Sequence, residues 1–515
     1  MNSPRGILPA SAAQFGSKIA LITDTVSLSY DQLDDLTNRV AMALVSRGLR
    51  PGQVVSLYSE NRWEWIVAYH GALKAGAIVN PINVMLTGAE LTYVLENCRA
   101  TTLFISGDKT ATLAALGEIE SLQTTVCFDA YSAQPSTDLL DFGELLAVAP
   151  MESACPAVKG DEPAVIGYTS GTTGHPKGAV QSHQSVFLNC AHTATMHGRT
   201  GSDVVVTALP AAHVYGNVSI NSTFLVGGTV VLLERFSAMS VLTQIERHGA
   251  TMFEGVPAMY AMLLADPALA GANLSTLTRC TVGGQTMPLS TIERWQDRSG
   301  CRLIELWGMT EIAGLGATHS LHTPPMPGTI GISLPGVELR VADVDDSART
   351  LPANQPGELM IRGPLVMLGY HENEAATDQT IEPDGWLHTG DVAVMDNVGY
   401  VRIVDRIKDM IITGGYNIYP AEIERVLSEH PKVALVAVGP VPDPVKGELA
   451  CAYIVPVAGA QLGADEIIAF AADRLAAYKR PRLVRLIEEL PLTSTGKVMR
   501  RRLIDLFTEA PSPSL

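Results

Sequence analysis

Apolar and polar positions alternate along this chain in blocks that predict strands and helices following one another. A helix is predicted over 31–48, because apolar residues recur there at helical spacing and the segment ends at a glycine. Apolar runs at 54–57 and 77–80 flank a helical stretch at 65–75 and predict buried strands. Further strands are predicted at 27–30, 164–168, 204–209 and 229–233. This alternation predicts layers of α/β structure with a mostly parallel sheet.

The pattern changes near 405–409, which predicts a domain boundary. Before it, the segments 357–361 and 392–404 favour strands joined by Gly- and Pro-containing turns. After it, a helix at 420–430, strands at 433–438 and 450–455, and a helix at 464–477 predict a small α+β unit. We therefore expect a large N-terminal domain over 1–407, with α/β layers and a β-rich part, and a small C-terminal domain over 408–515.

Composition narrows the function classes. The chain has 515 residues with 36 Lys+Arg against 53 Asp+Glu, a net charge of −17, which disfavours nucleic acid and anionic membranes as partners. The basic run Arg500–Arg502 is interpreted as a solvated helix face. No apolar run approaches the roughly 18 residues that span a bilayer. Seven scattered cysteines without a CxxC pair predict reduced thiols rather than disulfides or a zinc site, and the cytoplasm is the expected location.

The segment 168–178, YTSGTTGHPKG, combines glycines, hydroxyls and a lysine directly after an apolar strand. Successive backbone N–H groups in such a loop form an anion nest, and Lys177 adds a positive charge. The loop therefore suits a triphosphate. It differs from the Walker pattern, because Gly178 rather than Ser or Thr follows the lysine. The residues expected to bind phosphate are Thr169, Ser170, Gly171, Thr172, Thr173, Gly174 and Lys177.

This string resembles the signature of the adenylate-forming superfamily, which includes acyl-CoA synthetases, 4-coumarate-CoA ligase-like enzymes, peptide-synthetase adenylation domains and beetle luciferases. Further motifs follow in the family's order. The resemblance implies a Mg²⁺- and ATP-dependent enzyme that converts a small-molecule carboxylic acid to an acyl-adenylate and then to a coenzyme A thioester. It also implies a monomer or homodimer.

The nucleotide residues implied by the resemblance come from four motifs. In WGMTE, Trp307 would stack on adenine, Thr310 would contact the α-phosphate and Glu311 would hold Mg²⁺, with Gly308 beside them. GGQTMP would place Gly284 and Gln285 near the base. DGWLHTGD would supply Asp391 for both ribose hydroxyls, and DRIKD would supply Arg406.

The remaining motifs imply the rest of the machinery. In the family's last motif, TSTGKVMRR, Lys497 would be the catalytic lysine, delivered by a mobile C-terminal domain that pivots at Lys408. Gly414 and Gly415 would let the pantetheine arm pass close to the backbone. His213 would gate the carboxylate of the acid, and the acyl pocket would be lined by His213, Val214, Asn217, Gly283, Gly308 and Met309. In relatives restricted to acetate a Trp matches Gly308, so glycine is expected to leave the pocket open.

Two alternatives within the superfamily stay open. A stand-alone amino-acid adenylation enzyme normally carries an Asp just after the gate position, where this chain has Val214. A luciferase-like oxygenase shares all the nucleotide motifs. Because the predicted pocket segments are mostly apolar and small, an aryl, alicyclic or medium-chain acid is expected rather than a dicarboxylate.

Overall fold

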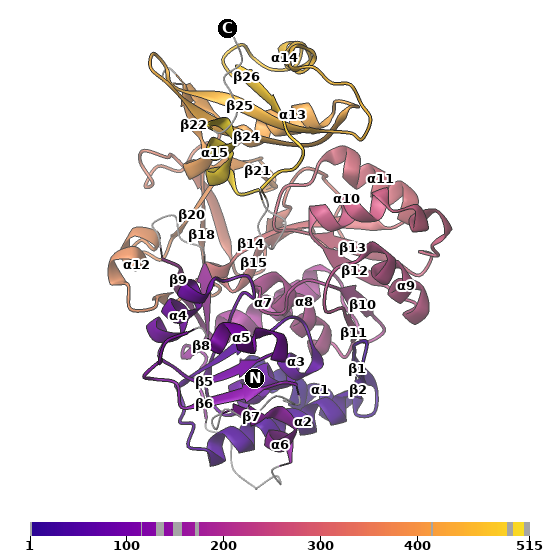
Figure 1. Ribbon diagram of the computed structural model, residues 1–515, viewed down its shortest axis with the longest axis vertical. Helices are drawn as coiled ribbons and strands as arrows, with labels where there is room; N and C mark the ends of the chain where they lie inside the picture. The colour runs from indigo at the N-terminus through magenta and orange to yellow at the C-terminus, as the bar shows by residue number, and fades with distance from the viewer. Residues whose placement is uncertain are drawn as a thin grey trace.

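The computed structural model of the chain describes residues 3–114, 116–129, 139–147, 157–169, 175–413, 416–491 and 498–508. The predicted roles of Ser170, Gly171, Thr172, Thr173, Gly174, Gly414, Gly415 and Lys497 lie outside these residues. The expected α/β architecture is confirmed, with a large N-terminal domain of several sheets below a small C-terminal domain (Figure 1).

An eight-stranded sheet forms one layer of the large domain, in the order β19-β9-β8-β4-β3-β5-β6-β7. It is parallel from β8 to β7 and antiparallel at the β19 and β9 edge. The strands are β3 (Val54–Tyr58), β4 (Ile78–Pro81), β5 (Ala100–Ile105), β6 (Thr124–Cys127), β7 (Leu139–Asp141), β8 (Pro163–Thr169), β9 (Lys177–Ser182) and β19 (Gly369–Tyr370).

A nine-stranded sheet forms a second layer, in the order β16-β15-β14-β13-β12-β10-β11-β1-β2, with a parallel centre from β14 to β1. The strands are β1 (Ile19–Ile22), β2 (Ser27–Ser29), β10 (Val204–Thr207), β11 (Thr229–Leu232), β12 (Met252–Gly255), β13 (Arg279–Val282), β14 (Arg302–Met309), β15 (Gly314–Thr318) and β16 (Ile332–Ser333).

Helices fill the space between these sheets and cover their outer faces. α7 (His183–Met196) contacts β8 and β9 of one sheet and β15 of the other, and α8 (Val214–Leu225) contacts β11 and β15. α9 (Ala238–His248), α10 (Pro257–Ala265) and α11 (Leu289–Ser299) pack on the nine-stranded sheet through a separate apolar cluster. Smaller helices are α4 (Gly88–Asn97), α5 (Thr110–Ala114), α6 (Phe142–Leu146) and α12 (Glu374–Thr380).

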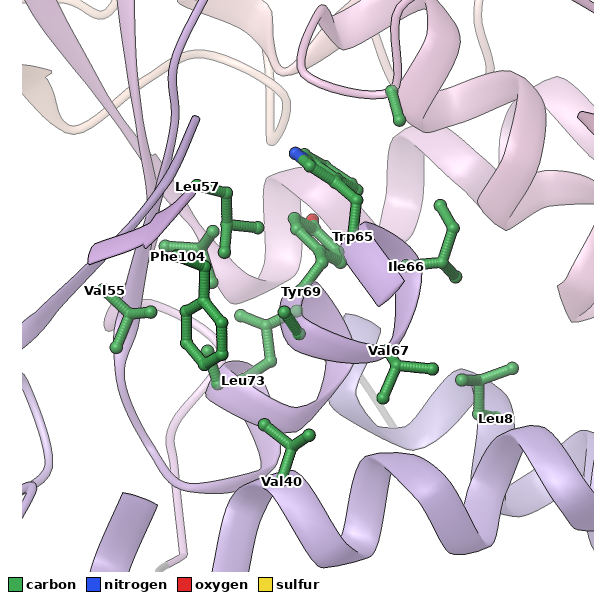
Figure 2. Close-up of a cluster of buried hydrophobic side chains, with 14 of the residues drawn as sticks. Leu8, Val40, Val55, Leu57, Trp65, Ile66, Val67, Tyr69, Leu73 and Phe104 are labelled. Atoms are coloured by element: carbon green, nitrogen blue, oxygen red, sulfur yellow. The ribbon is translucent and has the colours of Figure 1, made fainter. Parts of the chain in front are cut away.

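The core of the first layer is built around α3 (Trp63–Lys74), in which every residue from Glu64 to Lys74 is buried. A helix that is buried on all sides needs apolar partners all round. Figure 2 shows side chains of α3 meeting β3, β5, α1 (Ile7–Phe15) and α2 (Tyr30–Ser46). Within α3 the Trp65 and Tyr69 rings stack with centroids 5.3 Å apart. This packing joins α1, α2 and α3 to β3 and β5 in one apolar cluster.

An antiparallel sheet completes the large domain, in the order β17 (Glu338–Ala342), β18 (Gly357–Arg362), β20 (Leu387–Met395) and β21 (Val401–Arg406). The chain then passes through the single turn η5 (Ile407–Asp409) into the sheet of the small domain. That sheet holds β22 (Ile411–Thr413), β23 (Tyr416–Ile418), β24 (Val433–Asp443), β25 (Gly447–Pro456) and β26 (Leu483–Leu486), flanked by α13 (Pro420–Ser428), α14 (Ala464–Ala472) and α15 (Leu503–Thr508). The change of sheet lies between Arg406 and Ile411; the boundary at 407/408 itself stays a prediction.

The sequence predicted a longer α14, reaching residue 477, and that end is wrong. The Arg480 guanidinium accounts for the difference, because it donates to the carbonyls of Ala472 and Leu475 at 2.7 and 2.9 Å. The side chain thus satisfies carbonyls that another helical turn would have paired. Among the helices of the described ranges, none has the length and hydropathy needed to cross a bilayer.

Candidate active site

The turn after β14 lies against the two strands that bound the predicted phosphate loop. A Cβ added at Gly167 on β8 would come within 2.6 Å of Thr310 Cγ2, so the two elements touch. On β9, Gln181 Nε2 donates to the Thr310 carbonyl oxygen at 2.9 Å. The structure thus brings Thr310 against β8 and β9, the strands that end at Thr169 and begin at Lys177.

Glu311 is buried in this turn and is linked to the loop by a tyrosine. The Tyr370 hydroxyl donates to Glu311 Oε1 at 2.9 Å, and Lys177 Nζ lies 5.1 Å from the centroid of the Tyr370 ring. Burial raises the pKa of Glu311, while the bond from Tyr370 and the charge of Arg406 oppose that rise. A carboxylate, a hydroxyl and an ammonium group therefore converge from three elements.

A buried amide holds the turn that carries Glu311. Asn189 on α7 donates to the carbonyls of Ile312 and Leu315 at 3.0 and 2.8 Å and accepts from the Leu315 N–H at 3.0 Å. Between them Ala313 has a φ of 57°, a left-handed conformation that is uncommon for alanine. Strained backbone of this kind persists where its surroundings fix it, and here Asn189 does so.

Asp391 is the centre of a second cluster. Its Oδ2 accepts from Trp307 Nε1 at 2.7 Å, and its Oδ1 is 2.9 Å from Arg406 Nε. Asp391 and Arg406 are directly opposite each other on β20 and β21, and Trp307 comes from β14. The charges of Asp391 and Arg406 also act on Glu311, so the two clusters lie side by side.

The predicted gate residue begins α8. His213 is the residue before the helix, and its Nδ1 accepts from the Tyr215 backbone N–H at 3.2 Å. A neutral ring that accepts at Nδ1 carries its proton on Nε2. Asn217 follows one turn later, where Oδ1 accepts from the Tyr69 hydroxyl at 3.3 Å. Val214 and Met309 are partly buried, and their place in an acyl pocket stays a prediction.

The glycines of the predicted pocket have steric reasons of their own. A Cβ at Gly308 would overlap the carbonyl oxygen of Gly314, where β14 and β15 approach with a shift in register. This close approach gives Gly308 a steric reason of its own; that the glycine also leaves acyl space open stays a prediction. A Cβ at Gly283 would likewise overlap the Leu306 side chain. Gly284 has a φ of 88° and is exposed in the loop that it shares with Gln285, with neither residue bonded to the two clusters.

The predicted hinge residue, Lys408, is exposed in η5. Just before it, Asp405 is buried and its Oδ2 accepts from the Ala421 N–H at 2.8 Å, at the start of α13 in the small domain. Burial raises the pKa of Asp405 to about 6, against the effect of this bond. The contact joins the last strand of the large domain to the first helix of the small one.

Sequence reasoning missed Tyr370, Gln181 and Asn189. Tyr370 reaches Glu311 because Gly369 and Tyr370 pair with Val180 and Ala179 on β9, a contact between segments far apart in the chain. Asn189 and Gln181 sit in a helix and a strand whose local pattern is ordinary. Only their tertiary placement distinguishes them, so the single sequence carried no signal for these three.

Comparison with known proteins identifies the family. The chain matches the family described as AMP-binding enzyme over residues 8–371, and the AMP-binding enzyme C-terminal domain over residues 422–497. It belongs to the AMP-binding enzymes, the adenylate-forming superfamily, as the motifs implied.

Three relatives align over nearly their whole length. The chain is 34% identical to the 3-[(3aS,4S,7aS)-7a-methyl-1,5-dioxo-octahydro-1H-inden-4-yl]propanoyl:CoA ligase of Rhodococcus jostii (strain RHA1), covering 96% of both. It is 32% identical to the long-chain-fatty-acid–CoA ligase of Bacillus subtilis (strain 168), over 98% of this chain and 94% of the relative. It is 34% identical to a feruloyl-CoA synthase of an Amycolatopsis species, over 92% and 93%. These relatives and the family match support an acid–CoA ligase.

Solved structures show the same fold. The anthranilate CoA ligase AuaEII with anthranoyl-AMP has a TM-score of 0.91 at 28% identity, covering 98% of this chain and 97% of that one. ATP-bound MatB from Rhodopseudomonas palustris has a TM-score of 0.90 at 30% identity, covering 99% of both chains. The apo form of MatB, at the same identity and coverage, has a TM-score of 0.80. The overall structure of this chain is therefore more similar to ATP-bound MatB than to apo MatB.

Proposed function

We propose that this protein is an acyl-CoA synthetase that activates an aryl, alicyclic or medium-chain carboxylic acid with ATP and transfers the acyl group to coenzyme A. The observation that carries the proposal is the meeting of Glu311, Asp391 and Arg406 beside the ends of the predicted phosphate loop. Two carboxylates and one guanidinium from distant motifs come together, and the resemblance assigns all three to nucleotide binding.

The two half-reactions set different demands. In the first, the substrate carboxylate attacks the α-phosphate of ATP, pyrophosphate leaves and an acyl-adenylate forms. The carboxylate is already nucleophilic, so the barrier lies in bringing two anions together and aligning them. Lys177 and Lys497 would neutralise charge, Thr310 would donate to phosphate, and Asp391 with Arg406 would hold the ribose. In the second, the thiol of coenzyme A attacks the acyl carbon and AMP departs.

The carboxylate of the acid would meet His213 at the start of α8. The bond from the Tyr215 N–H to Nδ1 fixes the His213 ring at the start of α8, where we place the carboxylate. Asn217, held by Tyr69, follows on the same face of the helix one turn deeper.

Glu311 fits the needs of a Mg²⁺ ion that binds with ATP. Among the described residues no group of three or more His, Cys, Asp or Glu side chains comes together, so most oxygen ligands would come from the nucleotide and water. A single carboxylate with substrate phosphates is a usual Mg²⁺ arrangement. When bound, the ion would neutralise developing phosphate charge; Glu311 would hold it, and Tyr370 would orient Glu311.

The acid class follows from the relatives and the pocket. The relatives named above act on a bicyclic propanoate, long-chain fatty acids and ferulate by their names, and all of these are larger and more apolar than acetate. Each buried CH₂ contributes about 0.8 kcal/mol. We therefore expect a six-carbon or aromatic acid to have a kcat/KM at least about tenfold above that of acetate.

A pyrophosphate-release screen tests the proposal. ATP, Mg²⁺ and a panel of acids from acetate to decanoate, with benzoate, cinnamate and cyclohexanecarboxylate, are assayed with and without coenzyme A. Pyrophosphate release with an acid, and a CoA thioester only when coenzyme A is added, are expected. Lys497→Ala should nearly abolish pyrophosphate release yet largely spare thioester formation from supplied acyl-adenylate. No release with any acid would reject the function, and equal loss of both half-reactions would reject the role of Lys497.

A further inference from the structure

Both oxygens of Asp391 are occupied by protein donors. Trp307 Nε1 donates to Oδ2 at 2.7 Å, and Arg406 Nε lies 2.9 Å from Oδ1. Asp391 is only 4% exposed. A buried carboxylate with two donors in fixed positions has a fixed orientation, because rotating it would break both charge-assisted bonds.

The Trp307 ring is largely enclosed by the protein's own core. The residue is 8% exposed and belongs to an apolar cluster with Leu306, Ile361 and Leu387. Gly316 lies so close that a Cβ there would come within 2.6 Å of Trp307 Cζ3. The edge of the ring that carries the indole N–H is therefore fixed toward Asp391.

We propose that Trp307 is a positioning residue for ribose recognition: its indole N–H holds Asp391 in the orientation that accepts from the ribose hydroxyls. The inference rests on the proposed function, which assigns Asp391 to the ribose. Phenylalanine keeps an aromatic ring in the cluster but has no donor at the Nε1 position. Trp307 therefore acts through Asp391. Its loss should weaken the part of the nucleotide affinity that comes from the ribose hydroxyls.

Nucleotides that lack one hydroxyl separate this role from stacking. ATP, 2′-deoxy-ATP and 3′-deoxy-ATP are titrated calorimetrically into the wild-type protein, Trp307→Phe and Asp391→Asn. Trp386→Phe is the matched control, because Trp386 is a buried tryptophan whose ring lies 4.3 and 4.8 Å from the guanidinium carbons of Arg340 and Arg362. Thermal melts check that each variant is folded.

The wild type and Trp386→Phe should bind ATP at least about tenfold more tightly than each deoxy analogue, and Trp307→Phe should reduce this preference to within about threefold. An equal loss of affinity for all three nucleotides in Trp307→Phe would indicate a stacking or structural role and overturn the inference. If Asp391→Asn abolishes the preference and Trp307→Phe keeps it, the ribose assignment stands and the positioning role fails.

A wild type without any preference would reject the ribose assignment together with the inference. If Trp307→Phe does not fold, Trp307→Leu carries the same test, since leucine has no side-chain donor, whereas the hydroxyl of a tyrosine would itself be a donor. The expected result for that variant is the same reduction in preference for ATP over the deoxy analogues, and an unchanged preference would overturn the inference.

Discussion

Glu305→Gln should stabilise the protein at high pH more than at low pH. Glu305 lies on β14 with 8% of its surface exposed, and its Oε2 accepts from the Gly328 N–H at 2.9 Å. Burial raises the pKa of Glu305 from 4.5 to about 7. Between these two values the folded protein keeps a proton that the unfolded chain has lost, so stability falls as pH rises through this window.

The magnitude follows from the two pKa values. A folded pKa near 7 against 4.5 in the unfolded chain gives a penalty of about 3 kcal/mol once pH exceeds 7. Glutamine keeps an oxygen that can accept from the Gly328 N–H and carries no charge at any pH. The substitution therefore removes the pH-dependent contribution of residue 305 to the free energy of unfolding. The difference in unfolding free energy between Glu305→Gln and wild type should grow by about 2.5 kcal/mol from pH 5 to pH 8.

Urea unfolding at several pH values measures this difference. All five tryptophans lie between residues 63 and 386, so their fluorescence follows the large domain, which contains Glu305. Glu293→Gln, at an exposed position of α11, is the matched control and should show no growing difference. If the difference in unfolding free energy between Glu305→Gln and the wild type is the same at pH 5 and pH 8, the reasoning is refuted.

Three further predictions follow from other contacts. Arg199 and Glu254 form an ion pair whose side chains are 1% and 0% exposed, so Arg199→Met should lower the free energy of unfolding in urea by about 3–5 kcal/mol. The double variant Arg199→Met/Glu254→Met should recover most of that loss, and a double variant no more stable than the single one would contradict this. Tyr370→Phe removes a bond to the charged form of Glu311 and should raise the pKa of Glu311, which moves the acid limb of the pH profile for pyrophosphate release to higher pH. An unmoved limb would argue against this link. Lys408→Pro fixes the backbone angle φ at about −65° and should hinder the hinge motion. Pyrophosphate release should stay within about tenfold of the wild-type rate, whereas thioester formation should fall far more. Equal loss of both steps would argue against a hinge at Lys408.

Local pattern was sufficient for most elements of the fold. The segment from β3 through α3 to β4 was predicted to within two residues at each end, because short apolar runs and a helical repeat are both strong there. The end of α14 was not, because it depends on Arg480, eight residues beyond the last helical residue. A pattern within a window has no access to a side chain that returns from outside it.

The site shows the same division between local and tertiary information. Motif order brought Trp307, Glu311, Asp391 and Arg406 into one hypothesis, and the structure gathers these four side chains. No local pattern links Tyr370 to Glu311, which are 59 residues apart. The pattern offered an open pocket as the reason for Gly308, and the structure adds the close approach of the neighbouring strand as a second reason. Steric causes of this kind are visible only when both strands are placed.

Consecutive residues on β21 connect the ribose cluster to the small domain. Side chains alternate between the two faces of a strand, so neighbours such as Asp405 and Arg406 point to opposite sides. Arg406 engages Asp391 on one side, and Asp405 accepts from the first turn of α13 on the other. Lys408 follows two residues later, where the chain leaves the sheet. If Arg406 contacts the nucleotide, as proposed, a change in its position would act through one short, paired strand on the segment that leads into the small domain. The proposed nucleotide site and the proposed hinge at Lys408 would then be connected through β21.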